Sequence, residues 1–327
     1  MKTLQASLDS IEQSVKIIYD KAQRPGKPAR RFVHGKAHGL LRAEFQVLQD
    51  IPETFRVGLF KAPKIYSAWI RFSNGSPSNL PDFLPNTRGM AIKLLTEPDG
   101  EALEGVEQDF LLSNYPVFFV RNASDFSDLA ASVAKIGWLG AICPSFNPFR
   151  WRWRTLGIVL RSTFRWAASV AELRYWSQST FSVGTHAAKL SAQGCLRSSR
   201  KPCPLRTKYL RNEIRERFAR GEGALFEFYF QTWKGPDPAP VNDATMDWQE
   251  SKAPFHRVAM IRVPPQNFES QERLTLQEQM SFSPWHTLVE HAPLGEINLV
   301  RQKVYGVMAS IRHVLIRPNS RNAGSFH

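Results

Sequence analysis

Short runs of β-branched and aromatic residues, separated by turn residues, recur along much of this chain of 327 residues. Residues 31–122 carry several, and two more follow in the second half. Residues 225–231 alternate three phenylalanines with other side chains, which is the period of a half-buried strand. Short strands at this spacing predict an antiparallel sheet or barrel. The expected strands are Glu44–Leu48, Ser67–Phe72, Met90–Leu95, Phe110–Leu112, Val117–Val120, Leu225–Gln231 and Arg257–Val263.

Apolar residues at helical spacing predict helices between these groups of strands. An N-terminal helix is expected over residues 1–24, before a Pro-Gly pair. The stretch 126–173 is predicted to be helical, and it is rich in Trp and Arg. Another helix is expected over Tyr209–Arg220, with Gly221 at its C-terminal cap. No repeat or linker-like stretch occurs, so we expect residues 1–327 to form a single domain with 126–173 as an insertion.

Near the C-terminus, Arg301, Tyr305 and Arg312 share one stripe of a predicted helix. Four residues turn a helix by about 400° and seven by about 700°, so the three side chains project within roughly 40° of one another. Cations beside a phenol favour its ionised form, and a phenolate is a known ligand of haem iron. The neighbouring stripe is wholly apolar and predicts a buried face: Val300, Val304, Val307, Ile311 and Val314.

Composition limits the class of protein without choosing its partner. Hydrophobic residues make up 43% and aromatic residues 12%, which suits a large core or a pocket for a flat macrocycle. A net charge of +14 favours acidic partners such as nucleic acid, anionic lipid or carboxylate substrates. Three cysteines without CxxC spacing indicate neither a disulfide framework nor a zinc site.

Targeting signals are not evident in the sequence. Asp9 and Glu12 come before any apolar run, so the N-terminus does not have the pattern of a secretion signal. The longest uncharged run, residues 136–149, is too short to span a bilayer and contains prolines. A cytoplasmic protein is therefore expected.

Three dense stretches in the N-terminal half precede the helix that carries Tyr305. They are Arg31-Phe32-Val33-His34-Gly35-Lys36; Ile70-Arg71-Phe72-Ser73-Asn74 with Thr87-Arg88-Gly89-Met90-Ala91-Ile92-Lys93; and Gln108-Asp109-Phe110-Leu111-Leu112-Ser113-Asn114-Tyr115-Pro116-Val117-Phe118-Phe119-Val120-Arg121. In this order, the four elements resemble the haem-binding core of the catalase superfamily. They are most similar to its small members, the catalase-related haem peroxidases. The resemblance is strong over residues 30–122 and moderate over 225–316.

The resemblance implies an α+β fold: a catalase-like antiparallel β-barrel core, surrounding helices, and a C-terminal helix carrying the proximal haem ligand. It also implies haem b as the cofactor, with Tyr305 as the ligand of its iron. His34 corresponds to the distal histidine, Asn114 to the distal amide, and Ser73 to the serine that orients the histidine. The remaining residues implied to contact haem are Arg31, Arg71, Phe119, Arg301 and Arg312.

These residue types suit peroxide chemistry. A neutral imidazole can take a proton from one peroxide oxygen and return it to the other, and an amide can donate to the departing oxygen without titrating. The function implied is a haem peroxidase that reduces hydrogen peroxide or organic hydroperoxides with small donors, in an oxidative stress response. Alternatives are catalase activity, isomerisation of fatty-acid hydroperoxides of the allene oxide synthase type, and a haem carrier or sensor.

Each residue also has an ordinary interpretation. His34 alone fits a surface or core histidine, Asn114 and Ser73 fit turns, and Phe119 fits a core. The run Trp151-Arg152-Trp153-Arg154 first suggests a solvated basic face and second an anionic lipid surface. Nucleic acid is not expected as a partner. A homo-oligomer and a location peripheral to a membrane are left open.

Overall fold

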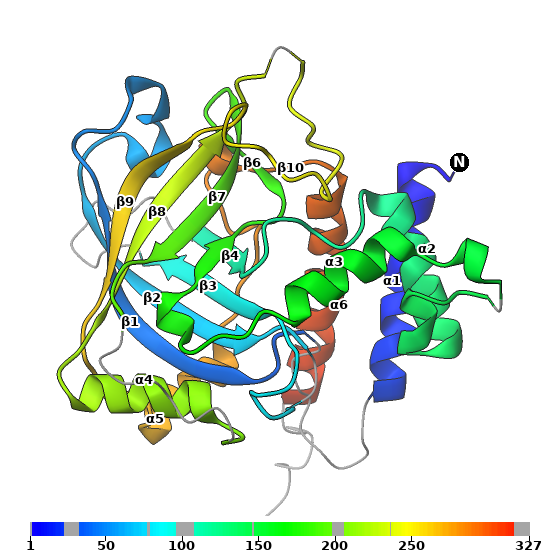
Figure 1. Cartoon of the computed structure of the whole chain (residues 1–327), viewed down its shortest axis with the longest axis horizontal. Coiled ribbons are helices and arrows are strands. Elements are labelled where there is room, and N and C mark those ends of the chain that lie inside the picture. The colour runs from blue at the N-terminus through cyan, green and yellow to red at the C-terminus, as the bar shows by residue number, and fades with distance from the viewer. Residues whose placement is uncertain are drawn as a thin grey trace, which may run out of the picture.

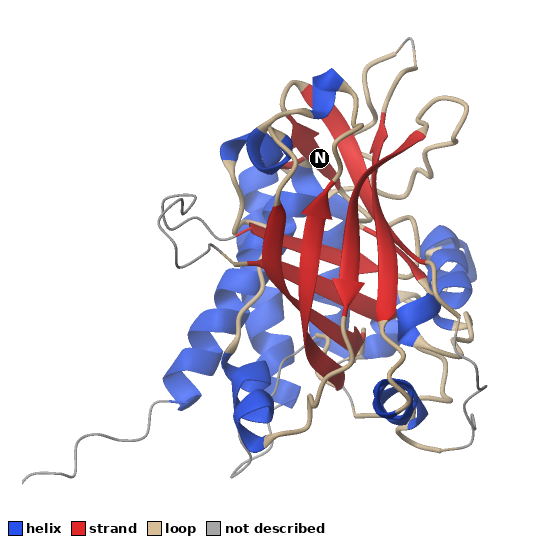
Figure 2. Cartoon of the chain, turned by 90° about the vertical axis from the view of Figure 1, so that its left-hand side faces the viewer, coloured by secondary structure: helices blue, strands red, loops and turns tan. Residues whose placement is uncertain are grey.

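A closed antiparallel β-barrel forms the centre of the computed structural model (Figures 1 and 2). The structure describes residues 2–22, 33–76, 79–95, 108–145, 147–197, 206–235 and 237–316, with only the backbone for residues 309–316. Eight strands close the barrel in the order β1-β2-β3-β4-β5-β7-β8-β9, and β6 and β10 continue from β7. The bounds are β1 Ala37–Val47, β2 Ile65–Asn74, β3 Arg88–Leu94, β4 Gln108–Ser113, β5 Arg174–Trp176, β6 Thr180–Val183, β7 His186–Gly194, β8 Ala224–Thr232, β9 Phe255–Val263 and β10 Pro293–Leu294. The predicted barrel with surrounding helices is confirmed.

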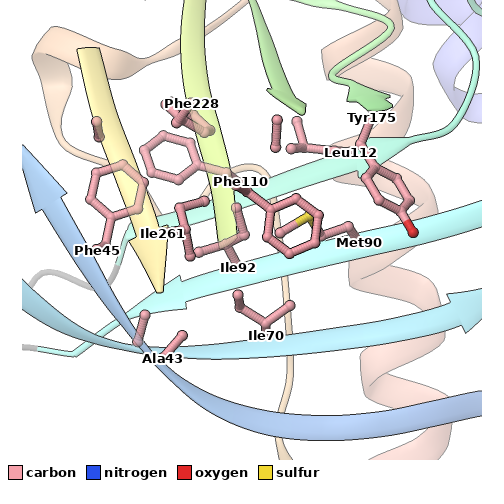
Figure 3. Close-up of a cluster of buried hydrophobic side chains, with 14 of the residues drawn as sticks. Ala43, Phe45, Ile70, Met90, Ile92, Phe110, Leu112, Tyr175, Phe228 and Ile261 are labelled. Atoms are coloured by element: carbon pink, nitrogen blue, oxygen red, sulfur yellow. The ribbon is translucent and has the colours of Figure 1, made fainter. Parts of the chain in front are cut away.

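Phenylalanine side chains fill the barrel interior (Figure 3). Phe226, Phe228 and Phe230 alternate along β8, and each is at most 1% exposed. Their rings pack edge to face or tilted, as in the pair Phe45 and Phe228 with centroids 5.2 Å apart. These phenylalanines therefore form a packed core inside the barrel, and the cavity described below has another lining.

Three helices pack together beside the barrel (Figure 1). Leu8, Ile11 and Val15 of α1 form a buried cluster with Ala123 of α2 and Val300 of α6. Val304 and Val307 pack against this cluster as the apolar stripe predicts, whereas the side chains of Ile311 and Val314 lie outside the described residues. The helices are α1 Leu4–Ala22, α2 Ala123–Ile136, α3 Trp153–Thr163, α4 Tyr209–Ala219, α5 Gln271–Gln279 and α6 Glu296–Ile316.

The stretch 126–173 is helical as predicted: it holds most of α2, all of α3 and three short 3-10 helices. The strand predicted at Val117–Val120 is wrong. Pro116 precedes it, and its backbone finds isolated partners: Phe118 N donates to Ala244 O and Gln178 Nε2 to Val117 O. Strand β7 was missed because alanine, glutamine and glycine favour strands weakly. Among the described residues, no helix is both long enough and apolar enough to cross a bilayer.

Two buried histidines make the stability of the fold sensitive to acid. Burial lowers the pKa of both His38 and His291 from 6.5 to about 4. Between those values the unfolded chain binds protons that the folded chain does not, so stability falls as the pH drops from about 6.5 to about 4. The full effect is about 3 kcal/mol for each histidine. Denaturant unfolding from neutral to about pH 5 checks this, and the variant His291→Gln should show a shallower pH dependence. An unchanged dependence in that variant would contradict the assignment.

Candidate functional site

A cavity lies where the chain enters β1, against strands β2 to β4 and helix α6. His34 comes from the segment before β1, Arg71 and Ser73 from β2, and Arg301 and Tyr305 from α6. His34 and Tyr305 thus line one space although 271 residues separate them in the chain. Its other lining residues are Val33, Gly89, Met90, Ala91, Leu111, Leu112, Ser113, Gln178 and Phe282.

The imidazole of His34 is held in place from several sides. Its Nδ1 lies 3.0 Å from Ser73 Oγ, and Arg71 donates a 2.8 Å hydrogen bond to the His34 carbonyl oxygen. His34 has a φ of 57°, a left-handed conformation that is uncommon for residues other than glycine and concentrates at functional sites. A Cβ at Gly89 would lie 2.5 Å from the His34 ring, so the ring can occupy this position only because residue 89 has no side chain.

Asn114 is buried at the end of β4, beside this cavity but not among the residues that line it. Its backbone N–H donates to Arg88 O at 2.9 Å, and its Oδ1 accepts from Arg88 N at 2.8 Å. The amide oxygen is therefore fixed by the backbone of β3. This orients the side chain and leaves the NH₂ group as its remaining donor end.

A buried polar network below the cavity fixes the ends of β2 and β3. The guanidinium of Arg88 donates to Asn74 Oδ1 and to Asp82 O, and Lys36 forms an ion pair with Asp82. His38 Nε2 lies 2.8 Å from the same Asn74 Oδ1. The sequence showed these residues only as parts of motifs. Their role in holding Ser73 and Asn114 in place depends on contacts across strands.

Arg301 and Tyr305, which also line the cavity, lie one turn apart on α6 and are both half-buried. Arg301 donates to Ser179 Oγ at 2.8 Å, and Ser179 in turn donates to Asn298 Oδ1 at 2.9 Å. Both partners are neutral, and no carboxylate among the described residues forms a salt bridge with Arg301. Its charge is thus available to a neighbouring anion.

Of the other residues predicted to contact haem, the structure places only some in the cavity. Arg71 lines the cavity, whereas Phe119 stacks on Phe118 with ring centroids 4.3 Å apart and lines a second cavity beside Trp151. Arg31 and the side chain of Arg312 lie outside the described residues. Sequence reasoning missed Gln178, which lines the cavity with a φ of 61° and carries no local signal in the sequence.

No group of three His, Cys, Asp or Glu side chains suited to a metal ion occurs among the described residues. Tyr305 is the candidate iron ligand that the cavity offers. Among the described residues, Cys143 and Cys195 are free thiols.

Comparison with known proteins supports the architecture. A family model described as Catalase matches residues 20–136, and no curated protein matches the chain. A fungal catalase structure shares 20% identity at a TM-score of 0.65, covering 92% of this chain and 61% of that one. Catalase A from Saccharomyces cerevisiae shares 19% identity at a TM-score of 0.64, covering 92% of this chain and 63% of that one. A bacterial catalase shares 18% identity at a TM-score of 0.62, covering 93% of this chain and 60% of that one.

The chain therefore spans about three fifths of the length of these catalases. At such identities the likeness concerns the fold, and the family model adds a sequence match over the segment that carries His34, Ser73 and Asn114. The barrel thus has the fold of the catalases, and residues 20–136 match the Catalase family model.

Proposed function

We propose that this protein binds haem b in the cavity and acts as a peroxidase that reduces hydrogen peroxide or organic hydroperoxides with small-molecule donors. One observation carries the proposal. A serine-held imidazole and an arginine-flanked tyrosine, from distant parts of the chain, line the same cavity. A cytoplasmic location, a role in the oxidative stress response and self-association remain expectations.

The residues present fit haem. Tyr305 offers an oxygen ligand for ferric iron, and Arg301, one helical turn away, lines the same cavity. Arg71 lines the cavity and would pair with a haem carboxylate, as we propose also for Arg31 and Arg312. When bound, haem would supply the redox chemistry that peroxide cleavage requires.

His34 would move the proton. Ser73 Oγ lies within hydrogen-bond distance of Nδ1 and can accept a hydrogen bond from an N–H group there. In that tautomer the neutral imidazole has its basic lone pair on Nε2. Nε2 would accept a proton from the nearer peroxide oxygen and return it to the departing one. Asn114, whose amide oxygen is fixed by Arg88, would donate to the departing oxygen.

Catalase activity is the second candidate. The matching family model and the three compared structures are all catalases. In that reaction a second hydrogen peroxide replaces the donor, and the same His34 and Asn114 would serve both half-reactions.

An absorption spectrum of the purified protein, followed by peroxide titration with and without a donor, tests both candidates. Peroxidase activity predicts a haem spectrum and donor oxidation, whereas catalase activity predicts gas evolution without a donor. Loss of a fatty-acid hydroperoxide without a donor would indicate an isomerase. A protein that takes up no hemin contradicts the proposal.

The variant Gly89→Ala tests the position of His34. The added methyl would lie 2.5 Å from the imidazole and displace it, and a misplacement of about 1 Å can lower turnover by about 10²-fold. Haem absorption should be unchanged, because the substitution leaves Tyr305 and Arg301 untouched. Gly157→Ala is the matched control, since its methyl would enter open space. Equal turnover in both variants would show that the ring position does not limit catalysis.

A further inference from the structure

Helix α3 exposes an apolar stripe to solvent where a surface helix ordinarily exposes polar residues. Trp153, Leu160 and Phe164 project within about 40° of one another, and they are 55%, 44% and 67% exposed. The buried residues of α3, Thr155, Ile158 and Ser162, lie on the far side of the helix. Core packing therefore does not account for the exposed stripe.

A basic stripe runs directly beside it. Arg154 and Arg161 each follow the apolar stripe by one residue, about 100° around the helix. Arg165 follows Phe164 just beyond the end of α3, and all three arginines are exposed. Only Arg154 reaches a carboxylate among the described residues, Asp243 at 4.0 Å, while Arg165 lies over the Tyr115 ring. We call these six residues, three apolar and three basic, the α3 face.

The segment before α3 also exposes aromatic side chains to solvent. Phe149 is 96% exposed, and Trp153 Nε1 donates to Pro148 O, so the two aromatic residues lie close to one another. Residues 136–166 hold five of the six highly exposed aromatic residues found among the described residues. Figure 1 shows α3 at the front of the molecule, between the barrel and helices α1 and α2.

Charge selects among the partners that could cover such a surface. Between Asp128 and Glu172 the chain has no carboxylate and six cations: Lys135, Arg150, Arg152, Arg154, Arg161 and Arg165. A second copy would bring the same positive charge against it in a two-fold interface. Nucleic acid offers phosphates and bases for stacking but no apolar medium for Leu160. An anionic bilayer offers phosphates for the arginines and an apolar boundary for Trp, Leu and Phe.

We propose that the α3 face docks this protein peripherally on an anionic lipid bilayer. Trp153, Leu160 and Phe164 enter the headgroup boundary, and Arg161, Arg165 and Arg154 contact lipid phosphates. The inner side of α3 packs through Ile158 against Tyr115 and Val117, just after Asn114. Docking thus brings Asn114, which lies beside the cavity, near the membrane. The proposal stands on the surface alone and does not depend on the proposed activity.

Vesicle co-sedimentation of the purified full-length protein tests this. We expect binding to phosphatidylcholine vesicles that contain phosphatidylglycerol, weak binding to pure phosphatidylcholine, and a blue shift of tryptophan emission on binding. The variant Arg161→Gln/Arg165→Gln should lower partitioning by about fivefold for each arginine removed and weaken its salt dependence. Trp153→Ser/Phe164→Ser should lower it by about tenfold or more, because apolar contact area is lost.

The matched controls are Arg262→Gln and Val289→Ser, an exposed arginine and an exposed apolar residue outside this segment. They should bind vesicles as the parent does, and all variants should keep its circular dichroism and melting temperature. Equal binding by face and control variants would overturn the proposal. So would a failure to bind anionic vesicles, whether the protein instead binds single-stranded oligonucleotides or forms a dimer that the face variants abolish.

Discussion

Replacing His34 with alanine is expected to lower peroxide turnover by roughly 10²–10⁴-fold while haem remains bound. Loss of a positioned acid–base group typically has an effect of this size. The substitution removes the imidazole that Ser73 holds at 3.0 Å and leaves Tyr305 and Arg301 in place. Steady-state peroxide consumption, normalised to haem absorption, measures the effect.

Two comparisons sharpen this test. Ser73→Ala keeps the imidazole but removes its partner at Nδ1, so we expect a smaller loss of turnover with a changed pH profile. His186→Ala, a histidine on β7 away from the cavity, is the matched control. Near-normal turnover in His34→Ala would remove His34 from the mechanism.

The variant Tyr305→Phe is expected to lose most of its haem, or to bind it with a changed absorption spectrum. The phenyl ring preserves the packing on α6 but has no oxygen to ligate iron. Hemin titration followed by absorption spectroscopy measures affinity and ligand type without requiring activity.

Tyr229→Phe on β8 serves as the control because it removes a phenol far from the cavity lining. It should bind hemin as the parent does. If Tyr305→Phe keeps the parent spectrum, the ligand lies elsewhere in the chain. Arg301→Leu should weaken binding less than Tyr305→Phe, because the proposed iron ligand remains in place.

Local pattern was enough for the parts of the fold whose periodicity is strong. The alternating phenylalanines of β8 predicted its inward face, and the apolar stripe of α6 predicted the buried face that packs against α1. The pattern failed at Val117–Val120, where β-branched and aromatic residues follow a proline and find partners outside the sheet. It also missed β7, whose alanines become a strand only because β5 and β8 lie on either side.

The sequence by itself determined which residue types could carry the chemistry, since His34, Ser73, Asn114, Arg301 and Tyr305 stand in recognisable motifs. Only the tertiary structure decided that they share or border one cavity, because that depends on β2, the segment before β1 and α6 lying around the same space. The glycine space beside His34, the Ser179–Asn298 support of Arg301 and the left-handed Gln178 were likewise invisible in the sequence. Each depends on contacts between residues far apart in the chain, which local propensity does not encode.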